Sequence, residues 1–188
     1  MPNDMQDTDM KIVGENPSEF LKKDKELYTD ADEYKQAENN GNLKRADKLG
    51  MLIAEEYVRA IKDEELPVSN DDNEDLVRQR ILLLSFTVMA GLEQYCPNMT
   101  LANASRSAFF NKLYEIDREL FEKSSDTGAF SFYYLSFRRG TEVDRRVGQT
   151  FAMLCSHDGD PVFQELGEAL YCWFVSRIKK NVEAVEFV

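Results

Sequence analysis

Apolar residues recur three, four or seven positions apart along most of this 188-residue chain, which is the spacing that gives a helix one apolar face. Phe20, Leu27 and Tyr34 follow this spacing in one segment, and the residues from Leu43 to Ala60 follow it in the next. Helices with apolar stripes bury them by packing against one another. The sequence therefore predicts an all-α fold.

Residues that start and stop helices divide the chain into about seven predicted helices. Asn16 and Pro17 form an N-cap with proline at the first helical position, and Pro67 closes the second helix. We expect a flexible acidic N-terminus at 1–15 and a single helical domain at 16–188. In this irregular bundle, an acidic helical hairpin (16–66) packs on an aromatic-rich main bundle (73–188). The predicted helices cover 17–40, 42–64, 73–95, 100–123, 129–139 and 141–154, with a last one from 161 onward.

The segment 129–139 fits two kinds of structure. Phe130, Phe132 and Tyr134 alternate as in a strand, whereas Phe130, Tyr134 and Phe137 fit a helix. No second strand-like run is available to pair with it, and a lone strand would leave its backbone donors without partners. We therefore expect a helix.

Three glycines lie inside predicted helices, where glycine costs about 1 kcal/mol relative to alanine. They are Gly91, Gly148 and Gly167. Close crossing of two helices is the favoured explanation, and a ligand that approaches the backbone is the alternative.

Charge and aromatic residues are unevenly placed. The chain has 35 acidic and 23 basic residues, a net charge of −12, of which residues 1–75 carry −11. Such a balance opposes sequence-independent binding to nucleic acid or to an anionic membrane, and favours a protein partner with a basic surface. Because 17 of the 21 aromatic residues follow residue 75, we expect the core to centre on 76–188.

The chain has the features of a cytoplasmic protein. Its first residues, Met1 to Asp9, lack the basic and apolar regions of a secretory signal. The longest apolar run, Ile81 to Leu92, is too short to cross a bilayer. With only three cysteines, we expect free thiols and no disulfide framework.

Motifs for catalysis or cofactor binding are not found in the sequence. The single histidine, His157, excludes sites that need several imidazoles, and Cys155 and Cys172 lack the paired spacing of a zinc site. Phosphate-binding glycine loops and the nucleophile elbow are absent. We therefore expect no cofactor and no metal.

One pair of carboxylates suggests an alternative. Glu55 and Glu56 resemble the start of the Glu-Glu-x-x-Glu motif of all-helical nucleotide pyrophosphohydrolases, although Arg59 stands where the third acid belongs. The resemblance implies Mg²⁺ binding by acids from two adjacent helices. The alternative function is thus a Mg²⁺-dependent nucleotide or phosphoester hydrolase.

Four arginines form a basic group that stands out in an acidic chain. Arg138, Arg139, Arg145 and Arg146 flank a predicted helix start, where guanidinium groups and backbone N–H groups can bind an anion or a partner. The other explanation is pairing with nearby acids or with the acidic hairpin. The sequence as a whole favours a protein-interaction module, such as an adaptor, an inhibitor or an immunity-type protein, that binds a basic partner.

Overall fold

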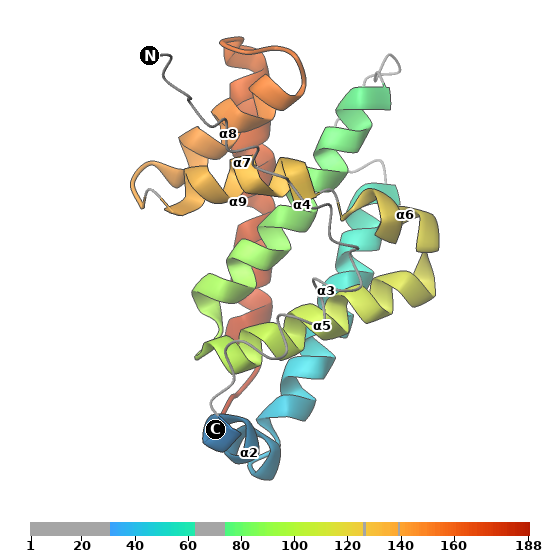
Figure 1. The fold of residues 1–188 in the computed structure, drawn as a ribbon, viewed down its shortest axis with the longest axis vertical. Helices are drawn as coiled ribbons and strands as arrows, with labels where there is room; N and C mark the ends of the chain where they lie inside the picture. Colours follow the sequence, from blue (N-terminus) through green and yellow to red (C-terminus); the bar gives the residue numbers. More distant parts are fainter. Residues whose placement is uncertain (1–30, 63–73, 126, 139) are drawn as a thin grey trace, which may run out of the picture.

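The computed structural model describes residues 31–62, 74–125, 127–138 and 140–188, and within these ranges its regular secondary structure is entirely helical, without a strand. Figure 1 shows two long helices, α4 and α9, side by side, with the other helices around them. The all-α prediction is therefore confirmed. The described helices are α2 (Ala31–Asn39), α3 (Asn42–Lys62), α4 (Glu74–Tyr95), α5 (Met99–Ile116), α6 (Arg118–Lys123), α7 (Thr127–Arg138), α8 (Val143–Leu154) and α9 (Pro161–Ala184).

A short turn joins α2 to α3, at the position expected between the first two predicted helices. Helices α2 and α3 meet at Gly41, whose φ of 78° lies in the left-handed region that glycine adopts without strain. Asn42, the first residue of α3, is buried and accepts a hydrogen bond from the Val188 backbone N–H at 3.0 Å. Asn42 also donates to the Val188 carbonyl, so the end of the chain is attached to this turn. The predicted flexible segment 1–15 and the start of the first helix lie outside the described residues.

The ambiguous segment is helical in its described part, 129–138, since α7 spans Thr127–Arg138. Tyr133 on this helix is fully buried and stacks on Phe86 of α4, with ring centroids 5.2 Å apart. The helical alternative is therefore the correct one.

The predicted helix 100–123 is wrong in one respect, because the structure breaks it at Asp117. The extended backbone of this residue (φ −154°, ψ 96°) ends α5 and begins α6. The Asp117 N–H donates to the Leu113 carbonyl at 2.8 Å, and the Asp117 side chain accepts from the Leu120 N–H at 3.0 Å. One aspartate thus closes one helix and caps the next.

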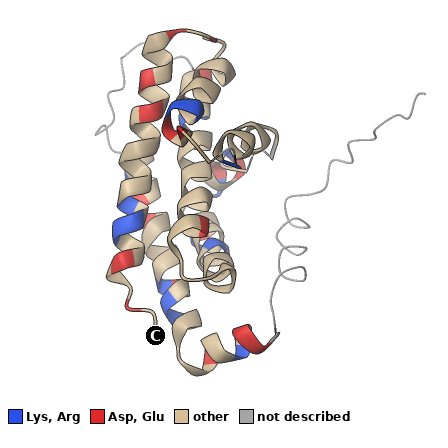
Figure 2. Ribbon diagram, turned by 90° about the vertical axis from the view of Figure 1, so that its left-hand side faces the viewer, with Lys and Arg blue, Asp and Glu red and all other residues tan. Residues whose placement is uncertain are grey.

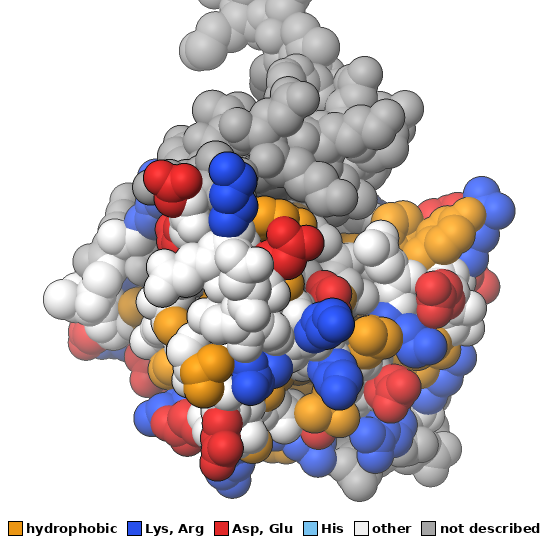
Figure 3. Space-filling view, turned by 90° about the horizontal axis from the view of Figure 1, so that it is seen from below, with side chains coloured by type: hydrophobic (Ala, Val, Ile, Leu, Met, Phe, Trp, Pro, Cys, Tyr) orange, Lys and Arg blue, Asp and Glu red, His pale blue; other side chains and the backbone are white. Residues whose placement is uncertain are grey.

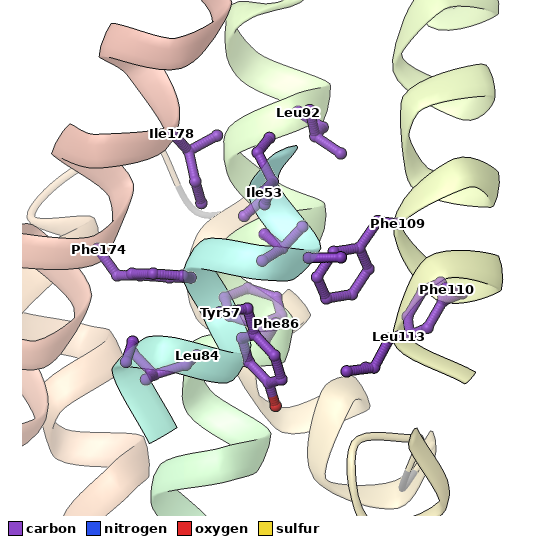
Figure 4. Packing of buried hydrophobic residues seen from close by; sticks show 14 of the residues in the cluster. Ile53, Tyr57, Leu84, Phe86, Leu92, Phe109, Phe110, Leu113, Phe174 and Ile178 are labelled. Carbon is purple, nitrogen blue, oxygen red and sulfur yellow. The ribbon is translucent and has the colours of Figure 1, made fainter. Parts of the chain in front are cut away.

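The core is larger than the sequence analysis expects, because α3 is part of it. Figure 4 shows Ile53 and Tyr57 of α3 among side chains of α4, α5 and α9. Tyr57 is fully buried and meets Phe109 edge to face at 5.5 Å. The expectation of a core centred on 76–188 is therefore too narrow. Helix α4 lies at the centre as predicted, with every residue from Arg80 to Val88 buried.

Close helix crossings account for the helical glycines. A Cβ on Gly148 of α8 would lie 2.4 Å from the Gln164 carbonyl oxygen of α9, and one on Gly167 would lie 2.6 Å from the Phe151 Cβ. The closest crossing is at Gly50 of α3, where a Cβ would lie 2.1 Å from the Ser105 carbonyl oxygen of α5. The sequence analysis does not single out Gly50, although it lies between the apolar residues of its stripe.

The described residues of the predicted basic group lie on helices α7 and α8. Helix α8 packs between α7 and α9, as Figure 1 shows. A hydrogen bond of 2.8 Å between the hydroxyls of Ser136 and Thr150 joins α7 to α8. Helix α3 packs most extensively on α5, and its described residues do not contact α7 or α8. The described part of the hairpin therefore does not meet the basic group.

Candidate functional site

The four arginines predicted to form a site lie around the turn between α7 and α8. Arg138 is the last residue of α7, whereas Arg145 and Arg146 lie in the first turn of α8. Arg139 lies outside the described residues. The N-cap of α8 is Glu142, whose φ of 50° is left-handed and whose side chain makes no capping hydrogen bond.

Two of these arginines have partners nearby. Arg145 Nη1 lies 3.5 Å from Glu142 Oε1, and both side chains are largely exposed. An exposed pair of this kind contributes about 0–1 kcal/mol, so it is easily exchanged for another partner. Arg138 lies over the ring of Tyr134, 4.9 Å from its centroid. Local pairing therefore occupies Arg145, as one sequence explanation expects.

Arg146 differs from the other two. It is half-buried, and its guanidinium makes no ion pair with any side chain in the described ranges. Its backbone carbonyl accepts the Thr150 hydroxyl at 3.0 Å, so the residue is held in helical register. A cation with a fixed backbone and no ion-pair partner is suited to receive a carboxylate from outside.

Tyr134 connects the basic group to the centre of the bundle. Its hydroxyl donates to Glu93 Oε2 of α4 at 2.7 Å. Burial, together with this hydrogen bond to a carboxylate, raises the pKa of the Tyr134 phenol. The phenol stays protonated at neutral pH and neutral in charge, so the basic character of the turn is not reduced by it. The sequence analysis treats Tyr134 only as part of an apolar stripe and does not find this contact.

The alternative metal site has one of its two carboxylates already engaged. Glu56 Oε2 accepts a hydrogen bond of 2.8 Å from Asn181 Nδ2 of α9, while Glu55 is exposed. Arg59, at the position of the missing acid, donates to the Glu55 backbone carbonyl at 3.4 Å. Among the described residues, no group of three or more His, Cys, Asp or Glu side chains could hold a metal ion.

His157 and the cysteines are in environments that do not favour nucleophilic chemistry. The His157 ring stacks in parallel on Phe163, with centroids 3.7 Å apart. Burial raises the pKa of Cys155 to about 12 and that of Cys96 to about 11, and it raises the pKa of Cys172 as well. Since the thiolate is the reactive form, these thiols are weak nucleophiles and weak metal ligands at neutral pH.

A shallow depression of about 170 Å³ lies between α4 and α5. Its apolar part comes from Met89, Leu92, Met99 and Ala102, and its polar part from Glu93, Asn103 and Arg106. This volume is below that of a typical small-molecule pocket, which is about 300–1,000 Å³. The depression is therefore too small to serve as an active site of ordinary size.

The charge of the described bundle is close to balanced. Its residues include 21 acids and 18 bases, so −9 of the net charge of −12 belongs to the remaining 43 residues. Figure 2 shows the charged residues of both signs spread along the helices. Figure 3 shows acidic and basic side chains interspersed at the end of the molecule where α2 lies. None of the described helices combines the length and the apolar character that crossing a bilayer requires.

Comparison with known proteins gives no relative. No family model, no curated protein and no solved structure matches this chain.

Proposed function

We propose that this chain is a cytoplasmic protein-interaction module that binds a partner with a basic surface through its acidic segments 1–30 and 63–73. The observation that carries the proposal is the separation of charge. A nearly neutral helical bundle is joined to two stretches that hold 13 of the 35 acidic residues and only four of the 23 basic ones. The three free cysteines support a reducing compartment.

Segment 63–73 has the higher density of negative charge of the two segments. It has five acidic residues and no basic one. It joins Lys62, the last residue of α3, to Glu74, the first of α4, and both helices belong to the buried core. A segment with this density of negative charge attracts a basic surface and raises the association rate at low salt.

This arrangement fits an adaptor or an inhibitor better than it fits the hydrolase alternative. Electrostatic binding of a basic partner needs only a high local density of carboxylates. Mg²⁺-dependent hydrolysis needs several carboxylates placed around one ion. Glu56 is hydrogen-bonded to Asn181, which favours a structural role for that carboxylate. Calorimetric titration with Mg²⁺ separates the two functions, since only the hydrolase requires saturable binding of the ion.

Two variants of the full chain test the proposal. In the first, Asp63, Glu64, Glu65, Asp71 and Asp72 are replaced by their amides. In the control, five acids of the described surface are replaced in the same way, so that the change in net charge is equal: Glu33, Glu38, Glu55, Glu165 and Glu186.

Binding of a fluorescent lysine-rich peptide of about 20 residues is then followed by anisotropy at several salt concentrations. We expect the first variant to lose about tenfold in affinity and the control to lose much less. The affinity of the unmodified chain should also fall steeply as salt rises. Equal losses in both variants would show that the peptide responds only to total charge, and the proposal would then fail.

A further inference from the structure

The outer face of α7 exposes large apolar side chains. Phe132 is 49% exposed and Leu135 is 64% exposed, while Tyr133 on the opposite face is fully buried. Phe132 and Leu135 are three positions apart, so they are neighbours on one side of the helix. Burying such side chains against a partner would remove unfavourable contact with water.

Helix α8 extends this apolar surface. The hydrogen bond between Ser136 and Thr150 fixes how the two helices lie beside each other. Phe132 precedes Ser136 by four residues and Met153 follows Thr150 by three, so both lie about one turn from that bond, on the side away from the connecting turn. Met153 is 39% exposed. Phe132 and Met153 therefore lie at this end of the pair, and the exposed Leu135 lies next to Ser136, level with the bond.

The opposite end, near the connecting turn, is basic. Arg138 follows Ser136 by two residues and Arg146 precedes Thr150 by four, so the two guanidinium groups belong to this end. Residues 127–154 contain four arginines and two acids, a net charge of +2 in a chain of −12. The net charge of residues 127–154 is thus opposite in sign to that of the whole chain.

We propose that the α7–α8 surface, formed by Phe132, Leu135, Met153, Arg138 and Arg146, binds an acidic amphipathic helix of another protein. Apolar side chains of that helix, three and four residues apart, cover Phe132, Leu135 and Met153. Its carboxylates pair with Arg138 and with Arg146, which has no ion-pair partner among the described side chains. Charge complementarity selects the acidic partner and repels a basic helix of equal hydrophobicity.

This inference does not depend on the proposed function, because it uses a different surface and a partner of opposite charge. If both hold, the chain joins a basic protein at its acidic segments to an acidic protein at α7 and α8. Such a bridge is the behaviour of an adaptor.

The test uses the full chain and three synthetic helical peptides of about 18 residues. The first carries leucines at helical spacing with glutamates elsewhere, the second has lysines in place of the glutamates, and the third has alanines in place of the leucines. Anisotropy gives the affinities, and amide chemical shifts in two-dimensional NMR spectra locate the contact. We expect the first peptide to bind at least about tenfold more tightly than the others and to shift amides of α7 and α8.

Variants of the chain distinguish binding at this surface from non-specific hydrophobic binding elsewhere. We expect two variants to bind the first peptide about tenfold or more weakly than the unmodified chain. One is Leu135→Glu, and the other is the double variant Arg138→Glu, Arg146→Glu. Leu52→Glu is the matched control, because Leu52 is an exposed leucine on α3. The proposal is overturned if Leu135→Glu and Leu52→Glu have equal effects, or if the shifted amides lie elsewhere. Thermal melting shows that each variant is folded.

Two other occupants of the surface would also overturn the proposal. If Leu135→Glu abolishes a concentration-dependent dimer in analytical ultracentrifugation, the surface binds a second copy of this chain. If Leu135→Glu alters the amide shifts of residues 1–30 in the free protein, the chain's own acidic segment covers it. With neither effect and with saturable binding of the acidic peptide, the partner is another protein.

Discussion

At the scale of single residues, the phenol of Tyr57 joins three elements inside the core. Its hydroxyl lies 2.8 Å from Ser124 Oγ, the C-cap residue of α6, and donates to the Ile81 carbonyl of α4 at 3.0 Å. Ser85 Oγ donates to the Ser124 carbonyl at 3.0 Å. Burial raises the pKa of Tyr57 well above its ordinary value, so the phenol stays neutral in the folded protein. These buried polar groups therefore satisfy one another where α3, α4 and α6 meet.

Removing this hydroxyl should destabilise the fold without disturbing its packing. Tyr57→Phe keeps the aromatic ring against Phe109 but deletes the hydrogen bonds to Ser124 and Ile81. We expect a loss of about 1–2 kcal/mol in the free energy of unfolding, measured by urea denaturation. Tyr114→Phe is the control, because Tyr114 is exposed and its hydroxyl is solvated. A loss of equal size in both variants would contradict a structural role for the Tyr57 hydroxyl.

Asp117 acts both as a cap and as an ion-pair partner. Its carboxylate lies 2.8 Å from Lys62 Nζ and accepts the Leu120 N–H. The hydrogen bond from Lys62, and then that from Leu120, lower the pKa of Asp117. Because the pKa is lower in the folded state, the stabilisation is complete above the ordinary carboxylate pKa and is lost as pH falls through the folded value.

Asp117→Ala should therefore lower the free energy of unfolding by about 1 kcal/mol at neutral pH, and by less at acidic pH. Asp117→Asn retains a side-chain oxygen that can cap α6 but loses the charge opposite Lys62. We expect the asparagine variant to be nearly as stable as the unmodified chain at low pH and slightly less stable at pH 7. Urea denaturation from about pH 2 to pH 7 checks this, and an alanine variant with the same loss at every pH would refute the titration argument.

At the scale of elements, the close approach of α8 to α9 depends on glycine. A Cβ on Gly148 would meet the backbone of α9 at Gln164, and backbone cannot move aside as a flexible side chain can. This approach sets how far α8 and α7 stand from the long helix. The position of α8 on α9 therefore depends on Gly148, together with Gly167 on the facing helix.

Gly148→Ala should force the two helices apart. Alanine favours the helix locally by about 1 kcal/mol, but the overlap should cost more, with a net loss of about 1–3 kcal/mol by thermal melting. Gln149→Ala is the matched control at the neighbouring exposed position of α8, and we expect it to change stability little. If Gly148→Ala were stabilising, the crossing would have to be looser than the structure indicates.

At the scale of the whole molecule, α9 holds the other helices together. It packs on α8 and α4 along much of its length and also touches α3. Its buried residues are Gly167, Leu170, Tyr171, Phe174, Ile178 and Val182. Beyond the helix, the end of the chain is bound by Asn42. One element thus connects α3 to the α7–α8 surface.

A chain cut after Gly159 should not fold cooperatively. Each large buried side chain of α9 contributes about 2 kcal/mol, and several together exceed a typical margin of about 5–15 kcal/mol once the surfaces they cover are exposed. Removal of residues 185–188 alone is the control, since it deletes the contact with Asn42 but keeps α9. We expect the control to melt cooperatively at a lower temperature. A cooperative melt of the 1–159 fragment would place the core elsewhere.

The sequence by itself determined the helical elements, because apolar spacing, caps and turn residues act within a few positions of one another. It predicted the helix of 129–139, the central place of α4 and the tight crossings at Gly148 and Gly167. Only the tertiary structure decided that α3 joins the core, that Asp117 breaks a helix whose apolar spacing continues, and that Tyr134 meets Glu93. The physical reason is that periodicity shows which face of a helix is apolar, but the partner of that face is selected by how all the helices pack at once.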